Sequence, residues 1–301
     1  MKKIRLIIAI VALMSFGGAL HANATPAWPT LSEGVNSLTM NGWESGYPNS
    51  WPQLNNLYGT IFAGVLNVSQ MYSENGSTSV QTYNNLNAGA GYLTGVFMAQ
   101  VTNISLASNG DAILTLGAVD YTSGQFASLS NAFKDAFGSY DAQNDTWTKD
   151  NASEVLKMYW STDLASVPTQ TYSSTNVNNI VSGDLWSSFQ LGSADDFSVN
   201  ILSQYVGGTV PQGNYFGTMD FSLSPTAGLA VQTLLGNTGG WQAAQASATG
   251  LGLTRTRQTG DYQVAIGDRA EIYATPEPAT MIAMGSGLLG LFGLRRRARK
   301  N

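Results

Sequence analysis

Apolar and polar residues alternate along several segments of the chain, the pattern of β-strands that bury one face and expose the other. The alternation is clear at residues 197–201 and 219–223, where Phe, Val, Ile, Met and Leu alternate with polar neighbours. Ala270, Ile272 and Tyr273 predict the last strand of the body. Gly, Ser, Asn and Thr fill the connections, as turn chemistry requires. The pattern therefore predicts a mainly β protein.

A hairpin is predicted near the middle of this pattern. Residues 96–106 and 112–119 are apolar and suited to strands, and Asn109-Gly110 lies between them. Asn-Gly is a favoured dipeptide of tight hairpin turns. We therefore expect the two segments to form an antiparallel pair.

Residues 125–137 break the β pattern. Four apolar side chains recur there at spacings of three, four and four, which places them on one face of a helix: Phe126, Leu129, Phe133 and Phe137. Gly138 follows as a candidate C-terminal cap. An aromatic face of this kind can serve as a ligand platform, but a helix seated on a core is the preferred interpretation.

Short strands and frequent turns favour a single β-sandwich or jelly-roll-like domain with one or two short helices, covering residues 25–275. Polar, turn-rich stretches at residues 41–56 and 169–179 predict long surface loops and not interdomain linkers.

The N-terminal segment has the three parts of a secretory signal peptide in order. Residues 1–5 are basic, residues 6–14 are uninterruptedly apolar, and Ala22-Asn23-Ala24 gives the A-x-A pattern that signal peptidase accepts. We predict a signal peptide at residues 1–24 and a mature start at Thr25; cleavage after Ala22 is the second candidate.

The C-terminal segment also has three parts. Pro276-Glu277-Pro278 comes first, and residues 279–294 follow without a charge. Five basic residues then close the segment: Arg295, Arg296, Arg297, Arg299 and Lys300. The apolar run is shorter than the about 20 residues that a membrane-spanning helix needs. Its basic flank predicts a short transmembrane helix with the C-terminus in the cytoplasm and the body outside.

Residues 276–301 resemble the PEP-CTERM sorting domain of Gram-negative bacteria, in which the same three parts occur in this order. The resemblance implies an exosortase as partner, transient attachment to the inner membrane, and a final place at the cell surface, outer envelope or extracellular matrix. It also implies a setting of exopolysaccharide production, biofilm or floc formation. An ordinary C-terminal membrane anchor is the alternative. The resemblance covers only the tail and says little about the body.

The net charge of the body limits the classes of ligand that it can bind. Between residues 25 and 275 there are six basic and eighteen acidic side chains, a net charge of −12. Nucleic acid is disfavoured because its binding depends on Lys and Arg that neutralise phosphates. An anionic membrane surface is disfavoured for the same reason, whereas a neutral or cationic glycan or a divalent cation is compatible.

The chain has no cysteine, and its one histidine, His21, lies in the predicted signal peptide. The predicted mature protein therefore lacks the residues of Ser-His-Asp and Cys-His catalysis and of histidine-based zinc sites. No catalytic residue is predicted. A pair of facing carboxylates, as in glycoside hydrolases, stays open, although Asp195-Asp196 on one strand would point to opposite faces.

Oxygen-bearing side chains are densest at Asp141, Asn144, Asp145 and Asp150, the ligand types that Ca²⁺ prefers. They form a candidate calcium site. The EF-hand pattern fails there, because Thr146 stands where glycine is required. A solvated acidic loop is the preferred interpretation.

Three aromatic residues lie in a Gly/Pro/Asn-rich stretch and are candidate glycan contacts: Trp43, Tyr47 and Trp51. Trp160 and Trp186 lie in apolar segments and are predicted to pack in the core.

Three functional hypotheses follow from the sequence. The first is an exported, non-enzymatic structural or adhesive protein of an exopolysaccharide matrix. The second is a carbohydrate-binding module, and the third a carboxylate-based glycan-degrading enzyme.

Overall fold

The computed structural model describes most of the body: residues 28–29, 31, 34–45, 57–75, 78–86, 91–193, 196–230, 246–257 and 264–274. The predicted signal peptide with Ala22 and Ala24, and the tail from Pro276 onward, lie outside the described residues. No helix within those ranges has the length and apolar character needed to cross a membrane.

The described chain is mainly β, as predicted. Its strands in chain order are β1 (Gly34–Ser45), β2 (Ile61–Asn75), β3 (Thr78–Asn84), β4 (Tyr92–Leu106), β5 (Ala112–Gly117), β6 (Gly138–Asp141), β7 (Thr146–Lys149), β8 (Glu154–Ser161), β9 (Asp184–Leu191), β10 (Phe197–Ile201), β11 (Tyr215–Ala227), β12 (Ala246–Arg257) and β13 (Val264–Ala274). The helices are α2 (Gly124–Ser128), α3 (Asn131–Phe137) and α4 (Ser174–Val181), with 3₁₀ turns at Leu164–Ser166 and Ser203–Tyr205.

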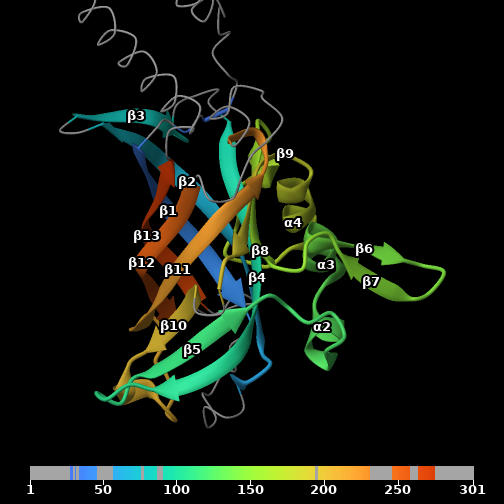
Figure 1. The fold of residues 1–301 in the computed structure, drawn as a ribbon, viewed down its shortest axis with the longest axis vertical. Coiled ribbons are helices and arrows are strands. Elements are labelled where there is room, and N and C mark those ends of the chain that lie inside the picture. Colours follow the sequence, from blue (N-terminus) through green and yellow to red (C-terminus); the bar gives the residue numbers. More distant parts are fainter. Residues whose placement is uncertain are drawn as a thin grey trace, which may run out of the picture.

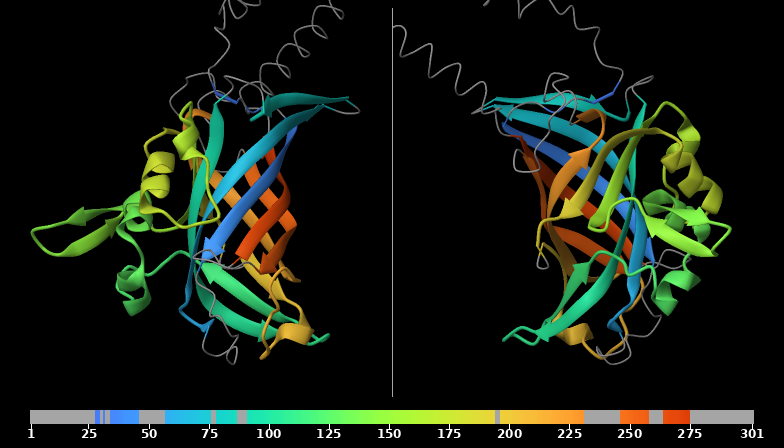
Figure 2. Two further views of the ribbon diagram at one scale, coloured as in Figure 1. Left: turned by 180° about the vertical axis from the view of Figure 1, so that it is seen from behind. Right: turned by 45° about the vertical axis from the view of Figure 1, so that its right-hand side comes forward.

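One large antiparallel sheet closes on itself (Figure 2). Around the ring the order is β1, β2, β4, β8, β9, β11, β12, β13 and back to β1. Strand β3 extends the sheet beyond β2 at one end (Figure 1). Closure pairs the backbone groups of strands that would otherwise lie at an edge.

Two long strands change partners along their length (Figure 1). The first half of β4 pairs with β8 and its second half with β5. Likewise, β11 pairs first with β10 and then with β9. The pair β5–β10 therefore completes one end of the ring, and the pair β8–β9 completes the other.

The sequence predicted a two-sheet sandwich or jelly roll. This part of the prediction is wrong, because the main strands belong to one continuous closed sheet. Both arrangements present the same alternation along each strand, so the local pattern cannot distinguish them. The difference depends on which strands pair at long range, here β1 with β13 and β4 with β2.

Two apolar clusters lie on opposite faces of the closed sheet. The inner one fills the ring with large side chains such as Phe62, Met71, Trp186 and Phe216. The outer one lies where α2, α3 and α4 cover β2, β4 and β8 on one side of the molecule (Figure 2). Strands in this region are consequently buried on both faces, as the pattern of β4 shows over residues 93–101.

The predicted hairpin is confirmed. Strands β4 and β5 are antiparallel, and Gly110 in the turn has a φ of +86°, a conformation that favours glycine. The strands predicted at residues 197–201, 219–223 and 270–273 are present as β10 and as parts of β11 and β13.

The single helix predicted over residues 125–137 is two helices. Leu129 has extended backbone angles and separates α2 from α3. Ser123 caps α2, while the Ser128 hydroxyl donates to the Gln125 carbonyl, one of the local bonds by which serine competes with helical pairing. The apolar face is nevertheless buried as predicted. Gly138 is the C-terminal cap of α3, as predicted, and its backbone is extended.

The two predicted surface loops are wrong in part. Residues 41–45 belong to β1, where they pair with β2 and β13. Residues 174–179 belong to α4, whose N-terminus is capped by the Ser173 side chain. Helix α4 forms because Val177 and Ile180 can be buried against the outer cluster, a tertiary contact that the polar local sequence does not reveal.

Candidate functional site

The interior of the closed sheet is packed and does not offer room for a ligand at the cavity found there. That cavity measures about 20 Å³, and its wall is apolar, including Met40, Phe97, Phe221 and Ile266. Ligand pockets are larger by an order of magnitude, about 300–1,000 Å³. This cavity is therefore a packing gap and not a ligand site.

The interior does contain one ion pair. Arg255 of β12 donates to the carboxylate of Glu44 of β1, and both side chains are fully buried. The guanidinium lies 5.7 Å from the ring centre of Phe62 and 5.4 Å from that of Phe216. Burial raises the pKa of Glu44 to about 7, against the opposing effect of Arg255. Enclosed by aromatic rings, the pair joins β1 to β12 and has no access to a substrate.

On the outer face, strand register brings polar side chains from four strands together. Ser37 of β1 lies opposite Tyr72 of β2, and Thr39 lies opposite Arg269 of β13. One row further, Glu74 of β2 lies opposite Ser79 of β3. Residues in register on neighbouring strands share a face of the sheet, so these six side chains surround one site.

These six residues line a pocket of about 230 Å³, which we call the outer polar pocket: Ser37, Thr39, Tyr72, Glu74, Ser79 and Arg269. It lies on β13, β1, β2 and β3, away from the helices that cover β4 and β8 (Figure 1). Its side chains include a carboxylate, a guanidinium and hydroxyl groups, so the pocket offers both donors and acceptors of hydrogen bonds.

A hydrogen-bonded group forms one wall of the pocket. The Ser37 hydroxyl donates to Glu74 Oε1 at 2.7 Å, and Arg269 Nη2 donates to both the Ser37 hydroxyl and the Glu74 carboxylate. Ser37 is 2% exposed, whereas half of the Arg269 side chain is exposed. A second carboxylate, that of Glu271, lies 3.9 Å from Arg269 Nε.

Tyr72 of the pocket is held in place by two glutamine side chains. Its hydroxyl donates to Gln70 Oε1 at 3.2 Å and accepts from Gln81 Nε2 at 3.2 Å. The ring is thereby positioned by residues of β2 and β3, and its partly buried face is an apolar surface beside the polar groups.

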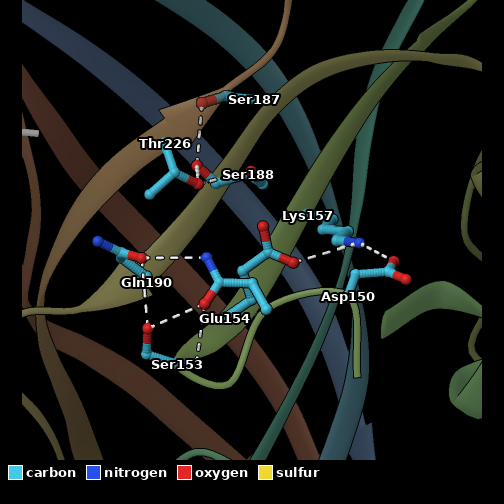
Figure 3. A network of polar contacts seen from close by, with 9 residues as sticks. Asp150, Ser153, Glu154, Lys157, Ser187, Ser188, Gln190 and Thr226 are labelled. Atoms are coloured by element: carbon cyan, nitrogen blue, oxygen red, sulfur yellow. Dashed lines mark hydrogen bonds and ion pairs between the residues drawn. The ribbon is translucent and has the colours of Figure 1, made fainter. Parts of the chain in front are cut away.

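A second group of polar side chains surrounds Lys157 of β8, on the side of the molecule that the helices cover (Figure 3). Its ammonium lies 2.9 Å from Asp150 Oδ2 and 3.3 Å from Glu154 Oε2, and its side chain is 9% exposed. Desolvation, with the neighbouring carboxylates, raises the pKa of Tyr159 and Tyr121. Each charge has a partner within the protein, so this group holds the β7–β8 connection to the sheet.

The remaining contacts in Figure 3 join the β7–β8 connection to β9, and β9 to β11. Asn151 Nδ2 donates to Gln190 Oε1 at 3.2 Å, and the Ser153 hydroxyl contacts the same oxygen at 3.3 Å. The hydroxyls of Ser188 and Thr226 lie 2.8 Å apart between β9 and β11. These bonds satisfy polar groups at a partly buried place in the sheet.

The candidate calcium ligands are divided between two places. Asp141 accepts from the backbone of Gln143 and from Asn144 Nδ2, and Asp145 accepts from the Tyr140 hydroxyl, all within the β6–β7 hairpin. Asp150 instead binds Lys157. Over the described ranges, no three acidic or histidine side chains are grouped as metal ligands. Calcium binding at this hairpin stays a hypothesis, and a solvated acidic loop stays the preferred interpretation.

Of the three aromatic candidates, the structure describes only Trp43. Trp43 is partly buried against the outer apolar cluster, while Tyr47 and Trp51 lie outside the described residues. Trp160 and Trp186 are buried as predicted, and the Trp186 indole donates to the Pro29 carbonyl at 2.7 Å. Asp196 accepts from Gly192 and Ser193 in a turn, and Asp195 lies outside the described part.

Sequence reasoning missed the outer polar pocket. Its residues come from β1, β2, β3 and β13, and residues 37 and 269 are more than 200 positions apart. Each of them lies at an outward position of an alternating strand, where a polar residue normally indicates only contact with water. No local signal separates these positions from other solvated ones.

The described body is thus a closed antiparallel sheet with a packed interior and a polar pocket on its outer face. Comparison with known protein families identifies a PEP-CTERM protein-sorting motif at residues 274–297, which confirms the resemblance of the tail. Comparisons with curated proteins and with solved structures gave no match. The motif marks an exported protein that an exosortase processes at the membrane.

Proposed function

We propose that this protein is a non-enzymatic structural or adhesive component of an extracellular polysaccharide matrix, delivered to the cell surface or beyond by an exosortase. The observation that carries the proposal is the sorting motif at residues 274–297, because it places the body outside the cytoplasm. In this scheme, signal peptidase releases the N-terminus, and the short C-terminal helix holds the chain in the inner membrane until it is processed.

The body supports a structural role by its construction. Its interior at the cavity is filled with apolar side chains, its backbone is paired around a ring, and helices cover one side. Without a cysteine in the chain, cohesion depends on this packing and on buried polar contacts such as that between Glu44 and Arg255. A predicted net charge of −12 disfavours polyanionic partners and is compatible with neutral polysaccharide.

The absence of enzymatic activity is part of the proposal. The carboxylates with described partners in the Lys157 group and in the outer polar pocket bind cations of the same chain. A carboxylate-based glycan hydrolase is the alternative, and it predicts turnover of a polysaccharide that stops when one carboxylate becomes an amide. We expect the exported protein to leave common polysaccharides uncleaved, as measured by reducing-end release.

The matrix role is tested in the host by deleting the gene and restoring it. The proposal expects the wild-type protein in the extracellular matrix fraction, and weaker cell aggregation or biofilm in the deletion strain. The control is a strain complemented with the Leu164→Ala variant, which changes an exposed position remote from the pocket. This variant should restore aggregation fully. Unchanged aggregation in the deletion strain, or a protein confined to the inner membrane, would contradict the matrix role.

A further inference from the structure

We propose that the outer polar pocket binds a single ring of a neutral sugar within a polysaccharide chain. This inference rests on the proposed matrix function, and it assigns that function a binding site formed by the six pocket residues on β1, β2, β3 and β13.

The size of the pocket selects a small ligand group. At about 230 Å³ it lies below the about 300–1,000 Å³ that enclose a drug-sized molecule. It has room for one sugar ring but not for an oligosaccharide. Because the pocket lies on the outer face of the sheet, where half of the Arg269 side chain is exposed, the rest of a polysaccharide chain can continue outside it.

The charges of the pocket select a neutral ligand. Arg269 is balanced by Glu74, and the carboxylate of Glu271 lies near the same guanidinium. An anionic sugar would therefore meet two carboxylates for one cation. A cationic sugar would have to compete with Arg269 for Glu74. Uncharged hydroxyl groups meet neither penalty.

The hydrogen-bonding groups fit adjacent hydroxyls. A sugar hydroxyl both donates and accepts, and the pocket places an acceptor, Glu74, beside a donor, Arg269. Bonds to ionised partners are stronger than those between neutral groups. Thr39 of β1 and Ser79 of β3 add hydroxyls on either side of β2, and the Tyr72 ring can pack against the apolar face of a sugar.

The pocket is already assembled without a ligand. Ser37 is buried and binds Glu74, Arg269 binds both, and Tyr72 is fixed by Gln70 and Gln81. Side chains held on paired strands lose little freedom when a ligand binds, so less of the binding energy is lost to ordering.

The experiment measures binding of the exported protein by affinity electrophoresis in gels that contain one polysaccharide each. The polysaccharides are galactomannan and xyloglucan as neutral chains, alginate as the anionic chain and chitosan as the cationic chain. We expect retardation by at least one neutral chain and none by alginate or chitosan.

Two matched variants locate the binding on β3. Ser79→Leu places a bulky apolar side chain at the rim of the pocket, and Thr78→Leu makes a similar change at the neighbouring exposed position, whose side chain points to the opposite face. We expect at least a tenfold loss of affinity with Ser79→Leu and less than a twofold change with Thr78→Leu. Equal melting temperatures of the two variants show that folding is not the cause.

The outcomes separate the pocket from the proposed function. Equal affinities of the two variants would overturn the pocket assignment, and retardation only by alginate or chitosan would overturn the ligand class. Absence of retardation for the wild-type protein would overturn the inference as well. In each case, finding the protein in the matrix fraction would still support the matrix role, since delivery depends on the sorting tail and not on the pocket.

Discussion

Glu44 and Arg255 form a fully buried ion pair, which carries a large desolvation cost. Both side chains are fully buried in the ring, so each ion has lost its contact with water. Desolvation of this kind costs several kcal/mol per ion and is offset only when the partners remain together. The aromatic rings of Phe62 and Phe216 beside the guanidinium recover part of this cost.

Replacing one partner should therefore lower the free energy of unfolding more than replacing both. We expect Glu44→Leu to lower the free energy of unfolding by about 3–5 kcal/mol, because Arg255 keeps its charge but loses its carboxylate. The double variant Glu44→Leu/Arg255→Met should be close to the wild-type protein. Urea unfolding of all four members of this cycle gives the coupling energy, and additive effects of the two substitutions would contradict the assignment.

The same pair predicts a pH dependence of stability. The pKa of Glu44 is raised from 4.5 to about 7, so between these values the folded protein holds a proton that the unfolded chain releases. The contribution of protonated Glu44 to the free energy of unfolding is thus fully present below about pH 4.5, and it is lost as the pH rises through 7. We expect the melting temperature to fall from pH 5 to pH 7.5 in the wild-type protein. The double variant should lack this fall, and the same slope in both proteins would exclude Glu44 as its source.

At the scale of elements, the helices stabilise one side of the sheet from outside. Phe133 of α3 is 2% exposed and its ring lies 6.1 Å from that of Tyr172, which precedes α4. The short helices α2 and α3 would be marginal alone. Their stability therefore depends on burial of this apolar face against β4 and β8.

Phe133→Ala tests this dependence. We expect a loss of about 3–5 kcal/mol in the free energy of unfolding, typical of a buried Phe replaced by Ala. Leu164→Ala, at a 68% exposed position of the same covering layer, should change it by less than about 0.5 kcal/mol. Hydrogen exchange should accelerate first in α3 and α4. Uniform acceleration in the whole sheet would instead mean that the helices and the sheet unfold as one unit.

The β6–β7 hairpin permits a separate test of calcium. Hydrogen bonds from Asn144 Nδ2 and from the Gln143 backbone hold the pKa of Asp141 below its usual value, and Asp145 accepts from the Tyr140 hydroxyl. We expect equal melting temperatures in millimolar Ca²⁺ and in EDTA. A site occupied at 100 times its Kd would add about 2.7 kcal/mol of stability, so a higher melting temperature in Ca²⁺ that Asp141→Ala abolishes would establish the site.

At the scale of the whole molecule, delivery and folding are assigned to different parts of the chain. The sorting motif lies at residues 274–297, whereas the described sheet ends at Ala274. The last strand, β13, pairs with both β1 and β12, so the body completes its ring where the tail begins.

Changes in the tail should thus affect processing and not export or folding. Replacing Pro276-Glu277-Pro278 with alanines, or deleting residues 295–301, should leave export intact and block maturation. Basic flanks resist translocation, so the deletion should also weaken retention in the membrane. The measurement is a blot of membrane, periplasmic and extracellular fractions, with and without the exosortase. Variants that mature and distribute like the wild-type protein would refute the sorting role.

The sequence by itself determined the elements that depend only on neighbouring residues along the chain. The turn at Asn109-Gly110 requires a backbone conformation that glycine adopts easily, so the hairpin could be predicted. Alternation predicted β10 and the middle of β11 because a strand with one buried face repeats every two residues. The order of Pro276-Glu277-Pro278, an apolar run and a basic cluster identified the sorting motif, which is read as a linear sequence.

Tertiary structure alone decided the features that depend on distant pairing. Alternation is the same in a sandwich and in a closed sheet, so only the pairing of β1 with β13 and of β2 with β4 reveals the ring. Helix α4 is stabilised by burial of Val177 and Ile180 and not by its polar sequence. The outer polar pocket exists because register places Arg269 beside Thr39 and Glu74 beside Ser79, and register is a property of paired strands that no single segment contains.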